Sequence, residues 1–257
     1  MIPLHFIMKL IFFILFITFL FPILFIGNKV IDMCSINHNK KAVFIHIPKN
    51  GGSYIANILS EYYGFTNYYF HRPDHSIFCH SKDKSVKMHE NKLHGTFIYY
   101  KTSPFINQRM NMTPEKWNTY TIFSFVRNPY DRLVSGWNYI NRYNIPFEKY
   151  LHIQNPNDYD YWHVFMSQTR HLLDVNGKIR CDYIGKFETM EDELKTILEK
   201  IGFSKTVHKP FLKNNKKHQP YQMYYTNNET IEIANKLFQY DFIHFGYDKI
   251  KIDKNNN

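Results

Sequence analysis

The sequence is poor in cysteine, with only Cys34, Cys79 and Cys181 among its 257 residues. These cysteines form no Cys-x-x-Cys pair and no cysteine–histidine cluster with zinc-site spacing, which argues against a structural zinc. Their odd number permits at most one internal disulfide and leaves one free thiol. The chain also lacks zinc-finger spacing and the aromatic motif of RNA-recognition domains, so nothing in it indicates nucleic-acid binding.

What the sequence does have is a large apolar share. Hydrophobic residues make up 44% of the chain and aromatic residues 18%, values typical of a globular domain rather than a disordered chain. Basic residues outnumber acidic ones, and the formal net charge is +10. Such a surface attracts nucleotides, acidic glycans or anionic lipid, although the same excess can serve only to keep a protein soluble.

The N-terminus contains the longest apolar segment. Leu10–Ile26 is uncharged, is interrupted only by Thr18 and Pro22, and follows Lys9. Its length is close to the minimum for a spanning helix and suits a thin bilayer such as that of the ER or Golgi. A cleaved signal peptide is the alternative, but no small-x-small cleavage site follows cleanly. We predict a signal anchor over residues 1–27, a polar linker over 28–41, a single domain over 42–250 and a polar tail over 251–257.

The orientation of this anchor is left open by the residues alone. Three lysines follow the apolar run, against Lys9 and the terminal amine before it, and this count places the domain on the cytoplasmic side. Two glycosylation sequons, Asn111-Met112-Thr113 and Asn228-Glu229-Thr230, instead fit a luminal domain.

A first motif follows the apolar run Ala42–Ile47, which predicts a buried parallel strand. Pro48 ends the run, Lys49-Asn50-Gly51-Gly52-Ser53-Tyr54 forms a glycine-containing loop, and Ile55–Tyr63 is predicted as a helix. A glycine pair lets backbone amides approach an anion closely, and the helix N-terminus adds partial positive charge. Ser53 can cap the helix or donate to a phosphate oxygen. An ordinary glycine turn is the alternative for this loop taken alone.

The position of the lysine distinguishes between classes of nucleotide-binding loop. In the loop of magnesium-dependent nucleotide hydrolases the lysine follows the last glycine and precedes Ser or Thr. Here Lys49 precedes both glycines, and Ser53 follows Gly52 directly. This order disfavours a nucleotide kinase or hydrolase. A lysine at the loop entrance can instead stabilise the leaving phosphate oxygen of a phosphosulfate.

A second motif follows the apolar run Thr121–Val126, which predicts another buried strand. Asn128 is a favourable helix N-cap and Pro129 a favourable first helical residue, so a helix is expected to include Leu133–Ile140.

Arg127 therefore lies at the carboxyl end of a strand, where open α/β sheets bind their ligands, and arginine forms bidentate contacts with phosphate. Ser135 lies about two helical turns further on and can reach the same phosphate. An ion pair with Asp131 is the alternative role of an arginine in this motif, and it has more weight for Arg132 than for Arg127.

Together the two motifs resemble those of the PAPS-dependent sulfotransferases, in particular carbohydrate-type members with an HIPKxGGTS-like loop. His46–Ser53 is similar to the 5′-phosphosulfate loop of that family and Phe125–Ser135 to its 3′-phosphate motif. Asp182–Glu188 and Tyr240–Tyr247 are similar to later segments, so the resemblance runs from about Lys41 to Tyr247. Asn50 and Ser53 depart from the family pattern, which has threonine at both positions.

The resemblance implies a P-loop-like, three-layer α/β fold with a central parallel sheet, as a single domain behind an N-terminal transmembrane helix. It implies transfer of a sulfuryl group from 3′-phosphoadenosine 5′-phosphosulfate (PAPS) to an acceptor hydroxyl on a glycan, including an acidic glycan, without a metal. A tyrosine side chain or a lipid is the alternative acceptor. It also implies a type II, single-pass protein of the Golgi or ER with a luminal domain. The residues expected to bind the donor are Pro48, Lys49, Asn50, Gly51, Gly52, Ser53, Tyr54, Arg127 and Ser135.

The acceptor hydroxyl needs a general base, and histidine is suited to this role near neutral pH. Related glycan sulfotransferases have a His-Gly-His element between the two motifs, and the nearest match here is His94-Gly95-Thr96. We therefore predict Lys49 and His94 as the catalytic residues, with His89 as the rival base. A non-catalytic, membrane-tethered binder of anionic glycans and a nucleotide kinase remain the alternative functions.

Overall fold

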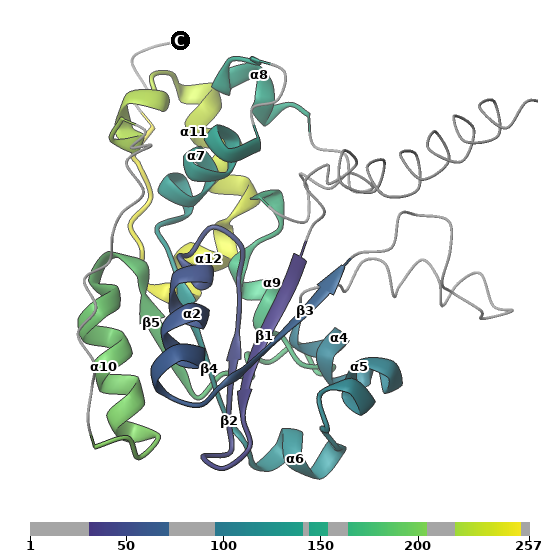
Figure 1. The fold of residues 1–257 in the computed structure, drawn as a ribbon. Coiled ribbons are helices and arrows are strands. Elements are labelled where there is room, and N and C mark those ends of the chain that lie inside the picture. Colours follow the sequence, from purple (N-terminus) through teal and green to yellow (C-terminus); the bar gives the residue numbers. More distant parts are fainter. Residues whose placement is uncertain (1–30, 72–95, 141–143, 154–163, 205–218, 253–257) are drawn as a thin grey trace, which may run out of the picture.

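The computed structural model describes residues 31–71, 96–140, 144–153, 164–204 and 219–252 (Figure 1). The predicted anchor over residues 1–27 lies outside these ranges, as do His89 and His94. Among the described residues, no helix combines the length and apolar character needed to cross a membrane.

The centre of the fold is a five-stranded sheet with the order β3-β1-β2-β4-β5. Strand β2 pairs in parallel with β4, and β4 pairs in parallel with β5. Strand β1 runs antiparallel to both β2 and β3. The sheet is therefore mixed, and the prediction of a parallel sheet is wrong for β1. The strands are β1 (Ile31–Asn37), β2 (Ala42–Ile45), β3 (Thr66–His71), β4 (Thr121–Val126) and β5 (Tyr183–Lys186).

Strand β1 also corrects the predicted linker over residues 28–41, because Ile31–Asn37 belong to the sheet. The polar residues of this segment indicated a linker, but two of them are buried and hydrogen-bonded. Ser35 donates to Asn67 Oδ1 at 2.7 Å, and Asn37 donates to the Tyr63 carbonyl at 2.7 Å. Such bonds offset the cost of burying polar groups, so the segment can form a core strand.

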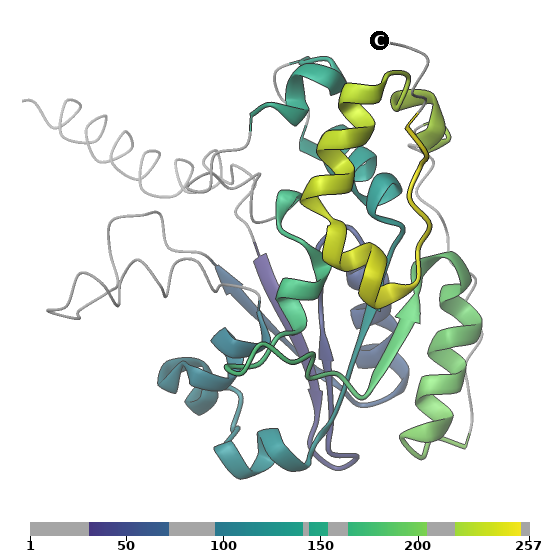
Figure 2. The ribbon, with the colours of Figure 1, turned by 180° about the vertical axis from the view of Figure 1, so that it is seen from behind.

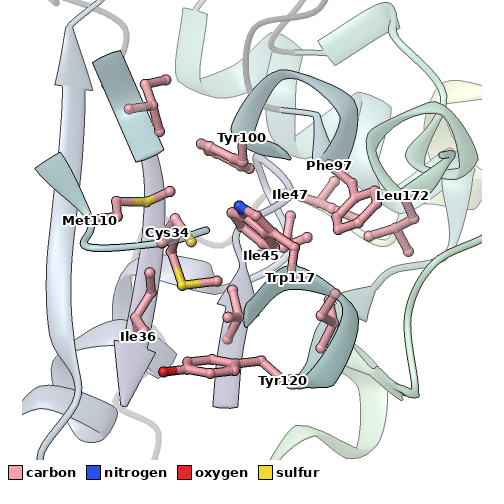
Figure 3. Packing of buried hydrophobic residues seen from close by; sticks show 14 of the residues in the cluster. Cys34, Ile36, Ile45, Ile47, Phe97, Tyr100, Met110, Trp117, Tyr120 and Leu172 are labelled. Carbon is pink, nitrogen blue, oxygen red and sulfur yellow. The ribbon is translucent and has the colours of Figure 1, made fainter. Parts of the chain in front are cut away.

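Helices cover both faces of the sheet, as Figures 1 and 2 show. On one face, side chains of α2 and α10 pack on Phe44, Phe123 and Phe125. On the other face, side chains of α4, α5, α6, α9 and α12 pack on Val43, Ile45 and neighbouring apolar residues (Figure 3). These helices are α2 (Gly52–Tyr62), α4 (Phe97–Thr102), α5 (Pro104–Arg109), α6 (Pro114–Thr119), α9 (Gln168–Leu172), α10 (Met190–Lys200) and α12 (Gln239–Phe245). The expected three-layer arrangement is present.

A third apolar cluster joins α12 to the remaining helices. It contains Leu133 and Val134 of α7, Leu151 of α8, and Ala234 of α11. These helices are α7 (Pro129–Ile140), α8 (Phe147–Leu151) and α11 (Asn228–Leu237), and the short 3-10 turns are η2 (Phe187–Thr189) and η3 (Tyr221–Tyr224).

Strands β2, β4 and β5 are adjacent and parallel, so their carboxyl ends lie at the same edge of the sheet. The segments that follow them begin at His46, Arg127 and Phe187. This is the edge at which open α/β sheets bind ligands. The fold therefore brings both sequence motifs to the same place.

Candidate active site

The first loop turns sharply between β2 and α2. Lys49 has a φ of 71° and Gly51 a φ of 75°, so both lie in the left-handed region. That region is uncommon for a residue with a side chain, and such strain is concentrated at functional sites. Gly51 is the N-cap of α2, and no side chain caps the helix in the described part of the chain. Ser53 therefore does not cap α2 and lies exposed in its first turn.

Two arginines hold the carbonyl groups of this loop. Arg127 Nη1 donates to the Lys49 carbonyl at 3.1 Å, and Arg132 Nε donates to the Pro48 carbonyl at 3.0 Å. In a trans peptide the N–H points opposite to the C=O. The N–H groups of Lys49 and Asn50 therefore point away from the arginines. Together with the uncapped first turn of α2, they give the loop the donors that bind an anion at a helix N-terminus.

The glycine pair lets backbone amides come close to an anion, and the packing around the loop also requires glycine at both positions. A Cβ at position 52 would lie 1.6 Å from Cδ2 of His46, so the imidazole occupies the space of a side chain. A Cβ at position 51 would lie 2.5 Å from the terminal carbon of Met190. These contacts give His46 a structural role.

Three of the loop residues predicted to bind the donor have other contacts in the structure or lack an N–H group. The side chain of Asn50 is buried and donates to the Phe125 carbonyl at 2.7 Å and to Gln168 Oε1 at 2.8 Å, so it faces the strands rather than a ligand. Tyr54 donates its N–H to the Gly51 carbonyl at 3.0 Å, and Pro48 has no N–H. Backbone donors to a ligand are therefore expected from the segment 49–53.

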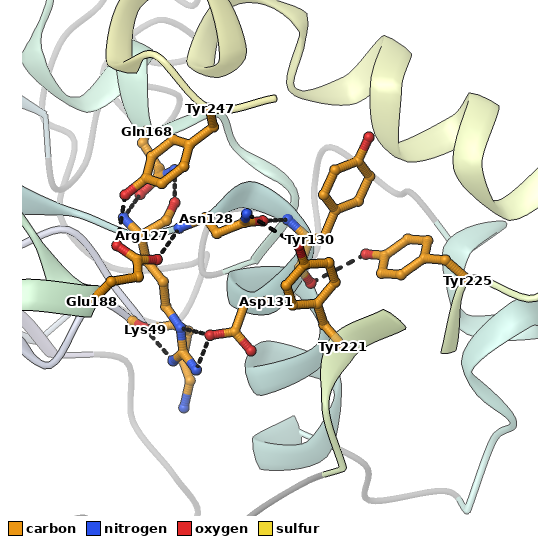
Figure 4. A network of polar contacts seen from close by, with 10 residues as sticks. All are labelled: Lys49, Arg127, Asn128, Tyr130, Asp131, Gln168, Glu188, Tyr221, Tyr225 and Tyr247. Carbon is orange, nitrogen blue, oxygen red and sulfur yellow. Dashed lines mark hydrogen bonds and ion pairs between the residues drawn. The ribbon is translucent and has the colours of Figure 1, made fainter. Parts of the chain in front are cut away.

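Arg127 is buried at the carboxyl end of β4 (Figure 4). Its Nε and Nη2 each lie 2.7 Å from Asp131 Oδ2, and its guanidinium lies 4.2 Å from the centre of the Phe187 ring. The ion pair that the sequence analysis weighed as an alternative is thus present. It fixes the guanidinium between the two loops, while phosphate binding by Arg127 remains a prediction.

Arg132 is fully buried and donates to backbone carbonyl groups. Besides the Pro48 carbonyl it contacts the carbonyls of Val164 and Met166, both at 3.0 Å. Burial lowers the pKa of its guanidinium to about 10, while the carboxylate of Asp241 acts in the opposite direction. The ion pair with Asp131, which the sequence favoured more for Arg132, is formed by Arg127, whereas Arg132 donates to backbone carbonyl groups.

One face of α7 is directed at this site. Asp131, Ser135 and Tyr139 are spaced by four residues and therefore lie along one stripe of the helix. Asp131 pairs with Arg127, and the Tyr139 ring lies 3.8 Å from Lys49 Nζ. Ser135 lies between these two residues on the same stripe, and its binding of a phosphate remains a prediction.

The second motif begins its helix as predicted. Pro129 is the first residue of α7, and Asn128 Oδ1 accepts a hydrogen bond from the N–H of Tyr130 at 3.0 Å.

Lys49 is half-buried beside two arginines. Desolvation, followed by repulsion from Arg127 and then Arg132, lowers the pKa of its amine to about 7. An anion bound at the loop would favour the protonated amine and raise this pKa again. The protonation of Lys49 is therefore expected to increase when a negatively charged ligand binds.

Sequence reasoning assigned no role to Glu188, Tyr247 or Gln168. Glu188 accepts hydrogen bonds from the Asn128 N–H at 2.7 Å and from the Tyr247 hydroxyl at 2.8 Å (Figure 4). It thereby joins the C-terminal segment to the second motif. Glu188 and Tyr247 lie in segments that carry the family resemblance, which was a usable signal, whereas no pattern in the sequence indicated Gln168.

Both candidate bases, His94 and its rival His89, lie outside the described residues. In the described ranges, no group of three or more His, Cys, Asp or Glu residues is placed to hold a metal ion. The expectation of metal-free chemistry remains a prediction.

These features define an α/β protein in which an uncapped helix N-terminus and two arginines lie at the carboxyl edge of the parallel strands. Residues 32–248 match the sequence model of the sulfotransferase family. The chain belongs to this family and is a transferase of the sulfotransferase class. No curated protein and no solved structure matches it.

Proposed function

We propose that the sulfuryl donor is PAPS, bound between the Lys49–Ser53 loop and the Arg127–Ser135 segment. The supporting observation is that both motifs meet at one edge, where Arg127 Nη1 lies 3.1 Å from the Lys49 carbonyl. A nucleotide with phosphate on both its 5′ and 3′ positions needs two anion sites this close together. The uncapped start of α2 and the cationic side chains of Lys49 and Arg127 fit such a ligand.

Each residue has a distinct role in this proposal. The N–H groups of Gly52 and Ser53 bind the 5′ phosphate, and Lys49 neutralises the charge that develops on the leaving phosphate oxygen. Arg127 and Ser135 bind the 3′-phosphate. PAPS supplies the activated sulfuryl group when it is bound. The protein contributes position and charge, which are the main requirements of transfers of this type.

The proposed acceptor is a hydroxyl group on a carbohydrate, including an acidic one. The formal charge of +10 and the carbohydrate-type character of the first motif support it. His94 is proposed to take the proton from the acceptor hydroxyl, because a neutral imidazole is a suitable base near pH 7. The proposed setting is the lumen of the Golgi or ER, with the apolar run Leu10–Ile26 as a single-pass anchor.

Donor binding is tested by thermal unfolding with PAP, the desulfated donor, and separately with ATP and Mg²⁺. A ligand that binds the native state raises its stability, so PAP should raise the unfolding temperature. Ser135→Ala should weaken PAP binding about tenfold, the effect of losing one hydrogen bond to a charged group. Ser60→Ala, an exposed change on α2, is the matched control. Stabilisation by ATP and Mg²⁺ but not by PAP would revive the kinase alternative.

The base is tested by sulfate transfer from labelled PAPS to a panel of glycans. His94→Ala should lower the transfer rate at least about 100-fold, the usual contribution of a general base, while the PAP-induced rise in unfolding temperature is retained. His89→Ala is the control and should transfer at nearly the wild-type rate. The reverse result would assign the base to His89. Glycan retention without any transfer, unaffected by PAP, would instead support the tethered binder.

A further inference from the structure

Gln168, the first residue of α9, is fully buried between the two proposed phosphate sites. Its side-chain amide binds both backbone groups of Arg127. The Arg127 N–H donates to Gln168 Oε1 at 2.8 Å, and Gln168 Nε2 donates to the Arg127 carbonyl at 2.8 Å. This pair of bonds fixes the backbone of Arg127 in position and orientation.

The same amide oxygen also binds the first loop. Asn50 Nδ2 donates to Gln168 Oε1 at 2.8 Å and to the Phe125 carbonyl at 2.7 Å. Gln168 Oε1 therefore accepts from both loops at once. The orientation of the amide follows from these partners, because a flipped amide would turn its NH₂ group toward two donors.

The backbone of Gln168 is in turn hydrogen-bonded to the side chain of Asp241 in α12. Asp241 Oδ2 accepts from the Gln168 N–H at 2.8 Å, and Asp241 Oδ1 accepts from the N–H and the hydroxyl of Thr169, both at 2.8 Å. Asp241 is fully buried, and burial raises the pKa of its carboxyl group, while the hydrogen bonds from Thr169 and Gln168 and the positive charge of Arg132 lower it. The backbone N–H groups of Gln168 and Thr169 are both held by this carboxylate, so the start of α9 has little freedom to move.

We propose that Gln168 is a positioning residue that sets the spacing between the two phosphate sites, so that the protein selects nucleotides phosphorylated on both the 3′ and 5′ positions. The inference rests on the proposed function, since it takes the Lys49–Ser53 loop and Arg127 as those sites. Gln168 itself is buried beneath the loops and touches no ligand. A change at Gln168 is therefore expected to lower the affinity for a nucleotide that carries both phosphates more than the affinity for a nucleotide that carries only one.

The test compares three nucleotides: PAP, adenosine 5′-monophosphate and adenosine 3′-monophosphate. Gln168→Met keeps the length of the side chain and removes its hydrogen bonds; Gln168→Glu keeps the shape and removes the donor. Each variant should weaken PAP binding at least about tenfold, the effect of losing one or two hydrogen bonds, and each monophosphate less than about threefold. Calorimetric titration of the full chain measures all three dissociation constants.

Gln108→Met, an exposed change on α5, is the matched control and should leave all three constants unchanged. An equal weakening of all three nucleotides in the Gln168 variants, or no weakening, would overturn the proposal. So would loss of folding in both variants, because Gln168 would then be required for the fold itself. A wild-type protein that binds PAP no more tightly than the monophosphates would instead overturn the proposed function.

Discussion

Lys49 combines backbone strain, partial burial and cationic neighbours in one residue. Its φ of 71° costs about 1–3 kcal/mol in a residue with a side chain. Its amine lies beside Arg127 and Arg132, and its pKa falls to about 7. The protein tolerates these costs at the loop where an anion is proposed to bind. They are therefore explained best by ligand binding rather than by stability.

The pKa of Lys49 leads to a prediction about the pH dependence of PAP binding. PAP binds the protonated amine, so affinity should be highest below about pH 7 and fall as the pH rises through 7, with proton uptake on binding at pH 8. Titration calorimetry in buffers of different ionisation enthalpy measures this uptake. Lys49→Met should abolish the uptake in this range and lower transfer at least about 100-fold, whereas Lys195→Met, an exposed control, should do neither. Unchanged uptake in Lys49→Met would assign the proton to another group.

Only part of the site could be predicted residue by residue. The position of Lys49 before the glycines and of Arg127 after a strand carried information, because short-range order determines what a loop can bind. The roles of Asn50 and Gln168 could not be predicted, because these side chains bind each other across 118 residues of sequence. The order of residues within a short segment does not show which distant side chain will be its hydrogen-bond partner in the folded protein.

At the scale of elements, the start of α2 depends on the contact between Gly52 and His46. Gly52→Ala would place a Cβ 1.6 Å from the imidazole, and overpacking of this kind costs about 1–3 kcal/mol. We predict a lower unfolding temperature and weaker PAP binding for Gly52→Ala. His46→Ala removes the obstructing ring, so the double variant should be more stable than the sum of the two single changes predicts. Thermal unfolding of all four proteins measures this coupling, and additive effects would contradict the packing role of His46.

The elements themselves were predicted where their pattern was strong. The apolar runs before the two motifs form β2 and β4, and the predicted helices correspond to α2 and α7. Strand β1 was missed because its polar residues resemble a linker. Its assignment depends on partners in β2 and β3, among them the bond from Ser35 to Asn67. Such pairing is a property of the assembled sheet and not of the segment.

At the scale of the whole molecule, the reversed strand β1 does not disturb the site. Strand β2 lies between β1 and β4, so the parallel set β2, β4 and β5 remains contiguous. The three segments that follow these strands still meet at one edge, which is what both motifs require. The error in the predicted sheet therefore left the predicted site in place.

The two sequons differ in exposure, and this difference leads to a test of the side of the membrane on which the domain lies. Asn111 and Thr113 are exposed between α5 and α6, whereas Asn228 is half-buried at the start of α11 and Thr230 is 2% exposed. A glycan is bulky and needs an exposed site. If the domain is luminal, as proposed, Asn111→Gln should lower the mass of the secretory-pathway protein by one glycan, and Asn228→Gln should leave it unchanged. A glycan on Asn228 would contradict the burial argument. Absence of any glycan in cells would contradict the luminal placement and favour the orientation that the lysine count gives.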